Sequence, residues 1–275
     1  MYHRGKVMKR KSLVAGYFYP KKPDDLKKMI QSMVKDTKNR KKAICIISPH
    51  AGYQYSGPVA GAVYSSVKLP QRYIILGPSH SFTESKVAVM KSGIWETPLG
   101  DVEILEELAE MICNGSAVIS EDSQAHIQEH SIEVQIPFLQ YFHQNISIVP
   151  ISISAYVSYE ELVETGNAVA KAIQSYTEDV MIVASTDMSH YVSQEEAREK
   201  DFLAIDKILH LDPEGLHEIV IKENISMCGF QPTTASLIAA KALSARKAEL
   251  IQYQTSGDVS GNTTEVVGYA GIRIL

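Results

Sequence analysis

Residues 43–57 read Ala-Ile-Cys-Ile-Ile-Ser-Pro-His-Ala-Gly-Tyr-Gln-Tyr-Ser-Gly. The apolar first part of this stretch ends at Ser48-Pro49-His50, and small residues and tyrosines follow. A short apolar run with such a boundary is typical of a strand that is buried on both faces. Apolar residues at helical spacing between Gly57 and Val67 predict a helix after it. His50 is therefore predicted to lie on a turn between a strand and a helix.

Two further strands are predicted to end in the same way. One runs from Tyr73 to His80, and the other covers Val180 to Ser185 and leads through Thr186-Asp187-Met188-Ser189 to His190. In open α/β sheets, ligands bind at the carboxyl ends of the strands. The three histidines lie far apart in the sequence, but they are expected to converge on one site.

The rest of the chain predicts an α/β fold. Helical patterns and apolar runs follow one another, and no long linker, low-complexity segment or repeat array divides them. We therefore expect residues 1–275 to form a single domain, with a mixed, largely parallel sheet flanked by helices. Within it, Trp95 to Gly100 is predicted to be a loop, and Asp101 is predicted to cap a helix that runs to Ile112.

Composition favours a cytoplasmic protein. The chain is 45% hydrophobic and 21% charged, and its three scattered cysteines do not suggest a disulfide framework. No apolar run approaches the roughly 20 residues that cross a bilayer, so no membrane partner is expected. Residues 1–42 hold 14 basic and 3 acidic side chains, a balance of +11 within a net charge of −5. Without interleaved aromatic residues or a recognised motif, this segment does not predict nucleic-acid binding.

Histidines at strand ends have two functional uses, because imidazole binds metals and titrates near neutral pH. The matching ends Pro49-His50 and Pro78-Ser79-His80 favour a shared site over two unrelated structural histidines. His190 follows Asp187, whose carboxylate can fix the tautomer of an imidazole. His190 is therefore a candidate third ligand or general acid/base. The alternative is that the Asp/His pair caps the following helix.

Cys228 is the cysteine with the most suggestive setting. It precedes Gly229 in a predicted turn, just before a helix from Thr233 whose N-terminal dipole favours a thiolate. A thiolate ligand, a nucleophile and an unreactive loop cysteine are all consistent with that position. Cys45 and Cys113 fall in apolar or helical segments and are expected to be inert core thiols.

Residues 126–130, His-Ile-Gln-Glu-His, match the H-x-x-E-H pattern of inverted zinc proteases, in which one helix carries both histidines. The polar lead-in and Pro137 indicate that the helix begins only near Ser131, so a protease is disfavoured. His130 remains a candidate for the same pocket as His50, with Glu129 and Glu133 as nearby carboxylates.

Taken together and in order, the motifs of this chain resemble the Memo family, whose members look structurally like LigB-type class III extradiol dioxygenases. The resemblance implies an α/β core with one pocket, with His50, His80 and Cys228 as metal ligands. It also implies that His190 is the acid/base group, with Asp187 and His130 close by. The motifs are Ala15-Gly16 before aromatic residues, Pro49 to Gly57, Leu76 to His80, Glu129 to Glu133, Ser185 to His190, and Cys228-Gly229.

The resemblance also concerns the pocket walls and the metal. Phe18, Tyr53 and Tyr55 are expected to contact a ligand, and in the animal protein the positions of Phe18 and Tyr55 are tied to binding a phosphotyrosine peptide. The dioxygenases hold ferrous iron with two histidines and a carboxylate, whereas the cysteine here is a softer ligand that favours copper or zinc. Iron, as the resemblance to the dioxygenases implies, or copper, which the thiolate favours, is the expected metal, with zinc as an alternative.

Two functions follow as hypotheses. The first is a metal-binding protein with redox or oxygenase-type activity on a small substrate, in which His190 moves protons. The second is a non-catalytic module that uses the same cleft for a peptide or a small anionic ligand. The sequence leaves the substrate and the oligomeric state open.

Overall fold

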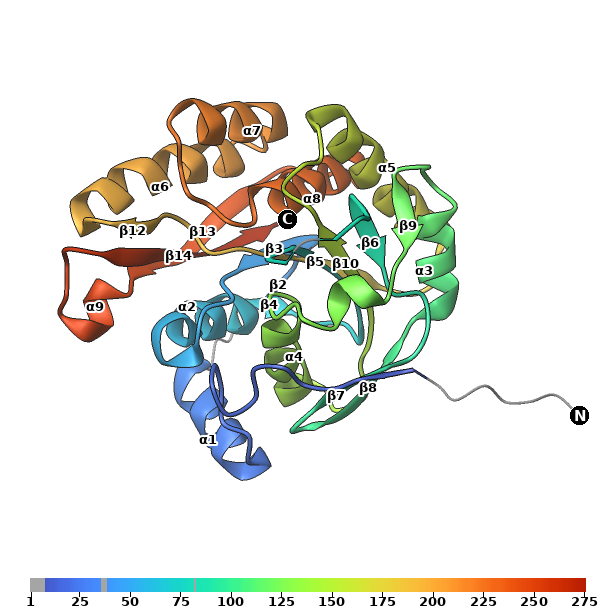
Figure 1. Ribbon diagram of the computed structural model, residues 1–275, viewed down its shortest axis with the longest axis horizontal. Helices are drawn as coiled ribbons and strands as arrows, with labels where there is room; N and C mark the ends of the chain where they lie inside the picture. Colours follow the sequence, from blue (N-terminus) through green and yellow to red (C-terminus); the bar gives the residue numbers. More distant parts are fainter. Residues whose placement is uncertain (1–7, 36–38, 82) are drawn as a thin grey trace, which may run out of the picture.

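A core of five parallel strands organises the fold (Figure 1). Four of these five strands are buried from their second residue onward, because helices cover both faces of the sheet. The computed structural model describes residues 8–35, 39–81 and 83–275. In spatial order the five strands are β8 (Gly100–Ile104), β10 (Ser147–Ile153), β5 (Arg72–Pro78), β11 (Val180–Ser185) and β3 (Cys45–Ser48).

Shorter and antiparallel strands extend this core into a mixed sheet of 12 strands. On one side β14 runs antiparallel to β3 and pairs with β13 and β12, and on the other side β7 and β1 follow β8. The expected mixed, largely parallel sheet is confirmed. The flanking strands are β1 (Lys9–Arg10), β6 (Val87–Val89), β7 (Ile94–Thr97), β9 (Ile119–Glu121), β12 (His190–Val192), β13 (Ala248–Thr255) and β14 (Val266–Ile274), and β2 (Lys41–Lys42) and β4 (Val67–Lys68) form a separate pair.

The helices divide between the two faces of the sheet (Figure 1). Within the described ranges, none of them has the length and apolar character needed to cross a bilayer. One face carries α1 (Pro23–Met33), α2 (Tyr53–Ser65) and α4 (Ile136–Phe142). The other carries α3 (Glu106–Cys113), α5 (Tyr159–Ser175), α6 (Gln194–Leu209), α7 (Pro213–Lys222) and α8 (Phe230–Ala242), while α9 (Gly257–Ser260) and the 3₁₀ turns η1 (Gln124–His126) and η2 (Glu133–Gln135) lie in loops.

The segment after Met90 differs from the sequence prediction. The expected loop over 95–100 belongs to a hairpin in which β7 and β8 pair through a turn between Thr97 and Gly100. Asp101 lies in β8 and caps no helix, and α3 begins only at Glu106. From Asp101 to Ile104, exposed and buried side chains alternate, and this period of two is that of a strand.

Residues 8–20, which we call the N-terminal strap, bind the loop that follows β9 through hydrogen bonds and an ion pair. Arg10 is buried and forms an ion pair with Glu133, and its Nε donates to the carbonyl of His126 at 3.0 Å. The Glu133 carboxylate also accepts from the backbone N–H of Leu13 at 2.8 Å. Further along the strap, the Phe18 carbonyl accepts the N–H of Tyr53 at 2.8 Å, which helps to explain why α2 starts four residues earlier than predicted.

Candidate metal centre

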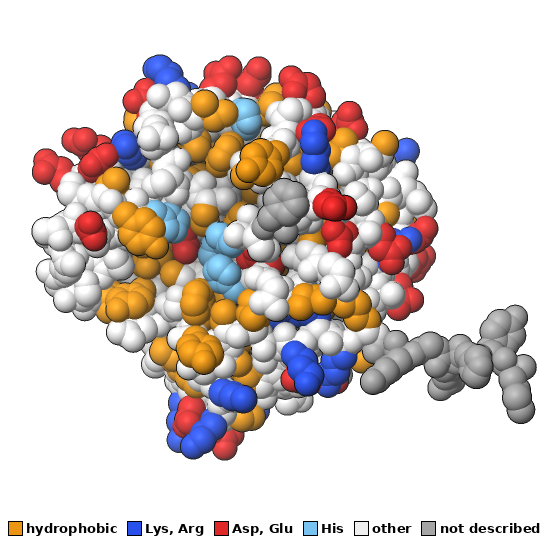
Figure 2. Space-filling view, in the orientation of Figure 1, with side chains coloured by type: hydrophobic (Ala, Val, Ile, Leu, Met, Phe, Trp, Pro, Cys, Tyr) orange, Lys and Arg blue, Asp and Glu red, His pale blue; other side chains and the backbone are white. Residues whose placement is uncertain are grey.

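A cavity of about 600 Å³ opens at the carboxyl ends of β3, β5 and β11. Figure 2 shows histidine side chains lying together near the middle of one face, with hydrophobic side chains around them. The prediction that three histidine-bearing strand ends converge is confirmed. The polar side chains in the cavity walls include His50, His80, His130, Asp187, His190 and Cys228.

Three of these side chains form a group that fits one metal ion. The donor atoms of His50, His80 and Cys228 all lie within 4.8 Å of one another. Cys228 Sγ is 3.3 Å from His50 Nε2, and the rings of His50 and His80 are 5.3 Å apart at nearly right angles. Two imidazoles and a thiolate suit zinc or copper, and three protein ligands leave a position open.

His80 is oriented from behind by a buried carboxylate. Glu129 Oε1 is 3.0 Å from His80 Nδ1, and Glu129 also accepts the backbone N–H groups of His80 and Ser131 at 2.6 and 2.7 Å. Burial opposes the charge, but the hydrogen bonds and charge of His80 lower the pKa of Glu129. Burial likewise opposes protonation of His80, and Glu129 outweighs it and raises the pKa of His80. With Nδ1 held by Glu129, His80 is free to present Nε2 to the cavity, as metal-binding histidines commonly do.

Cys228 reaches His50 because Gly229 allows a close crossing of two chain segments. A Cβ atom on Gly229 would stand 2.5 Å from both the Ser185 carbonyl oxygen and Thr186 Cβ. Burial, followed by the nearby charge of Asp187, raises the pKa of the Cys228 thiol. In the metal-free chain this shift favours the neutral thiol, one of the alternatives that the sequence left open, over a thiolate stabilised by the start of α8. A bound metal ion would displace the thiol proton.

Asp187 and His190 have separate partners. Asp187 Oδ1 accepts the backbone N–H groups of His50 and Ala51 at 2.8 and 3.3 Å, and burial raises its pKa to about 6. His190 Nδ1 lies 2.9 Å from the Ser226 carbonyl oxygen. Because a carbonyl oxygen only accepts, the neutral form of His190 carries its proton on Nδ1 and has a lone pair on Nε2. Ser226, which the sequence did not single out, therefore fixes the tautomer of His190 instead of Asp187.

His130 and Phe18 line the cavity as expected. The His130 ring lies 4.6 Å from that of His80, and the Phe18 ring meets His130 edge-on at 5.0 Å. Burial lowers the pKa of His130, which favours its neutral form. The strap therefore supplies an aromatic wall beside the histidines.

The two tyrosines expected beside Phe18 lie elsewhere. Tyr53 is buried in the core, where its hydroxyl donates to the Val134 carbonyl at 2.7 Å, and half-buried Tyr55 is not among the lining residues. Tyr191 takes their place at the cavity, with 77% of its surface exposed. Its φ of +58° is unusual for a large side chain. The signal available in the sequence was an aromatic residue directly after His190, a candidate site residue.

The zinc-protease pattern at 126–130 is not realised. His126 lies in η1, fully buried with its ring 5.8 Å from that of Trp95, whereas His130 faces the cavity. No helix joins the two histidines, because η1 is a single turn that ends at His126. The expectation that the helix begins beyond this pattern is confirmed by η2 and α4.

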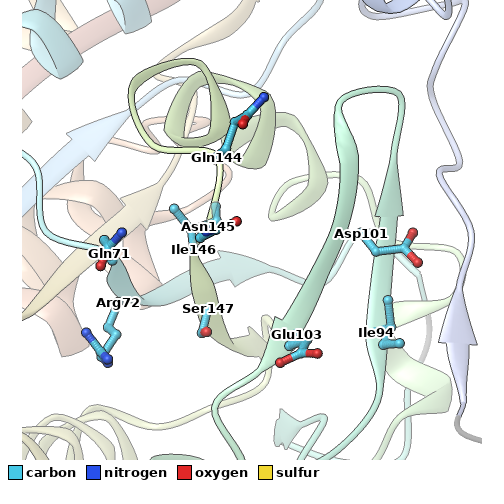
Figure 3. Close-up of a pocket in the computed structure, with 9 residues that line it drawn as sticks. All are labelled: Gln71, Arg72, Ile94, Asp101, Glu103, Gln144, Asn145, Ile146 and Ser147. Carbon is cyan, nitrogen blue, oxygen red and sulfur yellow. The ribbon is translucent and has the colours of Figure 1, made fainter.

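A second cavity, of about 480 Å³, lies at the opposite ends of the strands (Figure 3). Its walls include Arg72 and Ser147, the first residues of β5 and β10, and Asp101 and Glu103 of β8. None of its described lining residues is a histidine or cysteine, and Arg72 is already paired with Glu178 at 2.5 Å. The chemistry therefore concentrates in the histidine cavity, at the end of the sheet where α/β proteins bind ligands.

Comparison with known proteins identifies the family of the chain. The family model described as Memo-like protein matches residues 10–273. A MEMO1 family protein of Methanopyrus kandleri is 41% identical over 279 residues, covering 96% of this chain and 98% of the relative. One of Pyrobaculum arsenaticum is 43% identical, with the same two coverages of 96% and 98%.

The fold is also found in a solved structure. The crystal structure of an uncharacterized protein from Escherichia coli K12 matches with a TM-score of 0.55 over 83% of this chain and 99% of that chain. At 15% sequence identity this likeness concerns the fold alone. Because the family model spans nearly the whole chain and the relatives exceed 40% identity over almost all of it, the chain belongs to the Memo family.

Proposed function

We propose that this chain is a metal-binding protein with redox or oxygenase-type activity on a small substrate. The observation that carries the proposal is the placement of two imidazole nitrogens and one thiol within 4.8 Å of one another in the wall of a 600 Å³ cavity. A cavity of that volume accommodates a small organic ligand beside the metal. Copper or iron is the metal we propose, and zinc is the alternative for a centre without redox chemistry.

The residues around the centre have distinct roles in this proposal. Copper or iron, when bound, would supply one-electron redox chemistry. His190, with its Nδ1 proton held by Ser226, would accept a substrate proton at Nε2. Asp187 accepts the backbone N–H at His50 and lines the cavity, and burial raises its pKa to about 6. Phe18 and His130 wall the cavity and limit the positions that a substrate can take.

The alternative is a module that binds a peptide or anion in the same cleft without catalysis. Phe18 and Tyr191 would suit an apolar or aromatic group on such a ligand. Among the described residues that line the cavity, however, none is a lysine or arginine to pair with a phosphate. This composition favours the metal-dependent proposal over recognition of a phosphotyrosine-like group.

Metal titration tests the assignment. Copper(I), iron(II) and zinc are titrated into the anaerobic wild type and into His50→Ala, His80→Ala and Cys228→Ser. The matched control is His143→Ala, because His143 Nε2 binds the Leu69 carbonyl and lines none of the cavity. We expect the three site variants to lose at least tenfold in affinity and the control to keep it. Equal binding by all five proteins, or none by the wild type, would contradict the site.

Oxygen consumption separates catalysis from binding. The metal-loaded wild type and His190→Ala are compared with a panel of small reductants that includes thiols and catechols. Metal-dependent turnover that falls at least a hundredfold in His190→Ala, with metal affinity unchanged, is the expected result. A protein that binds metal but turns over none of the panel, and binds peptide instead, would favour the second function.

A further inference from the structure

A chain of buried polar side chains lies behind His50. His50 Nδ1 is 2.9 Å from Ser185 Oγ, at the end of the neighbouring strand β11. That hydroxyl is also 2.7 Å from the Ser131 carbonyl oxygen and 2.8 Å from Gln135 Nε2. His50, Ser131, Gln135 and Ser185 are each exposed by 2% or less. Buried polar groups of this kind are placed by their hydrogen bonds, so each contact limits the next.

The orientation of the Gln135 amide is determined by its surroundings. Its Nε2 lies 2.9 Å from the Pro49 carbonyl oxygen, which only accepts, and its Oε1 accepts the Tyr64 hydroxyl at 2.8 Å. The amide nitrogen therefore faces Ser185 as a donor. A reversed amide would place its oxygen against the Pro49 carbonyl.

The Ser185 hydroxyl has one proton, and that proton is already committed. It points to the Ser131 carbonyl, because this oxygen cannot donate. Gln135 donates to one lone pair of Ser185 Oγ, so the remaining lone pair faces His50. The His50 ring nitrogen at that position must carry a proton. His50 is therefore the Nδ1–H tautomer, and the lone pair of Nε2 points toward Cys228 Sγ, 3.3 Å away.

We propose that Ser185 and Gln135 are positioning residues that fix the tautomer of His50 and aim its Nε2 lone pair at the metal position. The tautomer assignment depends only on the hydrogen bonds of the metal-free chain. Its consequence for metal affinity rests on the proposed function. The two centre histidines are thus held by different chemistry, His80 by a charged carboxylate and His50 by a neutral hydroxyl and amide.

The tautomer is measured directly in the metal-free protein by long-range ¹H–¹⁵N NMR on histidine-labelled samples, with His50→Gln used to assign the signal. We expect the wild type to carry the proton on Nδ1. In Ser185→Ala the proton should move to Nε2, where it can donate to Cys228 Sγ. Gln135→Met should give a smaller shift. The matched control is Ser152→Ala, which removes a fully buried strand hydroxyl that has no hydrogen-bond partner among the described residues.

Zinc affinity, read by competition with a chromophoric chelator, provides the second measurement because zinc is redox-silent. We expect Ser185→Ala to weaken zinc binding by roughly 10- to 100-fold relative to Ser152→Ala, the range found for partners of metal-binding histidines. An Nε2–H tautomer in the wild type overturns the proposal, as does a Ser185→Ala variant that matches the control in tautomer and affinity. If the variants fail to fold, the wild-type spectrum alone decides the assignment. A wild type that binds none of copper(I), iron(II) and zinc, with Nδ1–H intact, contradicts the proposed function only.

Discussion

Replacing Arg10 by methionine should be among the most damaging single changes to this fold. Arg10 is 2% exposed, and its guanidinium serves three acceptors, namely the Glu133 carboxylate and the carbonyls of His126 and Glu129. Methionine fills much of the volume but leaves a buried carboxylate without its cation and two carbonyls without a donor. Removing one partner of a buried ion pair costs about 3–5 kcal/mol, and the unpaired carbonyls place Arg10 toward the upper end.

Urea unfolding of Arg10→Met, followed by circular dichroism and by fluorescence of the single tryptophan, measures this loss. The matched control is Lys42→Met, because Lys42 pairs with Asp179 while both side chains stay 75% and 73% exposed. An exposed pair contributes roughly 0–1 kcal/mol, so the two variants should differ by at least about 2 kcal/mol in the free energy of unfolding. Equal losses in the two variants would show that the strap is not anchored by the buried pair.

Two further changes test other parts of the structure. Burial lowers the pKa of His126 from 6.5 to about 4, so the stability from its neutral ring is full above pH 6.5 and is lost as the pH falls to 4. A shift of one pKa unit corresponds to 1.36 kcal/mol, so between pH 7 and pH 4 the free energy of unfolding of His126→Phe should fall by roughly 3 kcal/mol less than that of the wild type. Urea unfolding at several pH values measures the difference, and parallel pH profiles would contradict it. Gly229→Ala places Cβ 2.5 Å from the Ser185 carbonyl oxygen, so it should lower the free energy of unfolding by about 1–3 kcal/mol and weaken zinc binding. The control is Gly52→Ala, whose Cβ would meet nothing closer than 3.7 Å. Equal stability of the two variants would refute the argument that Gly229 allows a close crossing.

The parts of the fold that the sequence predicts are those with a local signal. The buried parallel strands before His50 and His80 are unbroken apolar runs, and the proline after each run marks its end. The hairpin of β7 and β8 differs from the prediction because Asp101 resembles a helix cap, whereas Val102 and Ile104 alternate with exposed residues as in a strand. Asp is found both at helix caps and on the exposed face of a strand, so the alternation after Asp101 and the pairing with β7 are what distinguish the two structures.

The site was predictable where its residues bear the chemistry themselves, as the three strand-end histidines do. The residues that orient them were not, because their roles depend on contacts across the fold. Gln135 meets Ser185 across 50 positions of sequence, and the Ser226 carbonyl meets His190 across 36. Tyr53 is a second example, because its position near His50 in the sequence predicts a cavity wall, whereas in the fold its ring is buried in the core.

The residues of the proposed metal centre lie far apart along the chain, and this separation sets the order in which they appear during synthesis. His50 and Cys228 are 178 positions apart, so a ribosome adding roughly 5–20 residues per second takes on the order of ten to thirty seconds between them. For most of that interval, once His80 has been made, the nascent chain offers two imidazoles without their sulfur partner. The last strand, β14, inserts beside β3 only after Cys228 has been made. The three residues of the proposed centre therefore come together only late in synthesis, and the proposal places metal loading after the chain has folded.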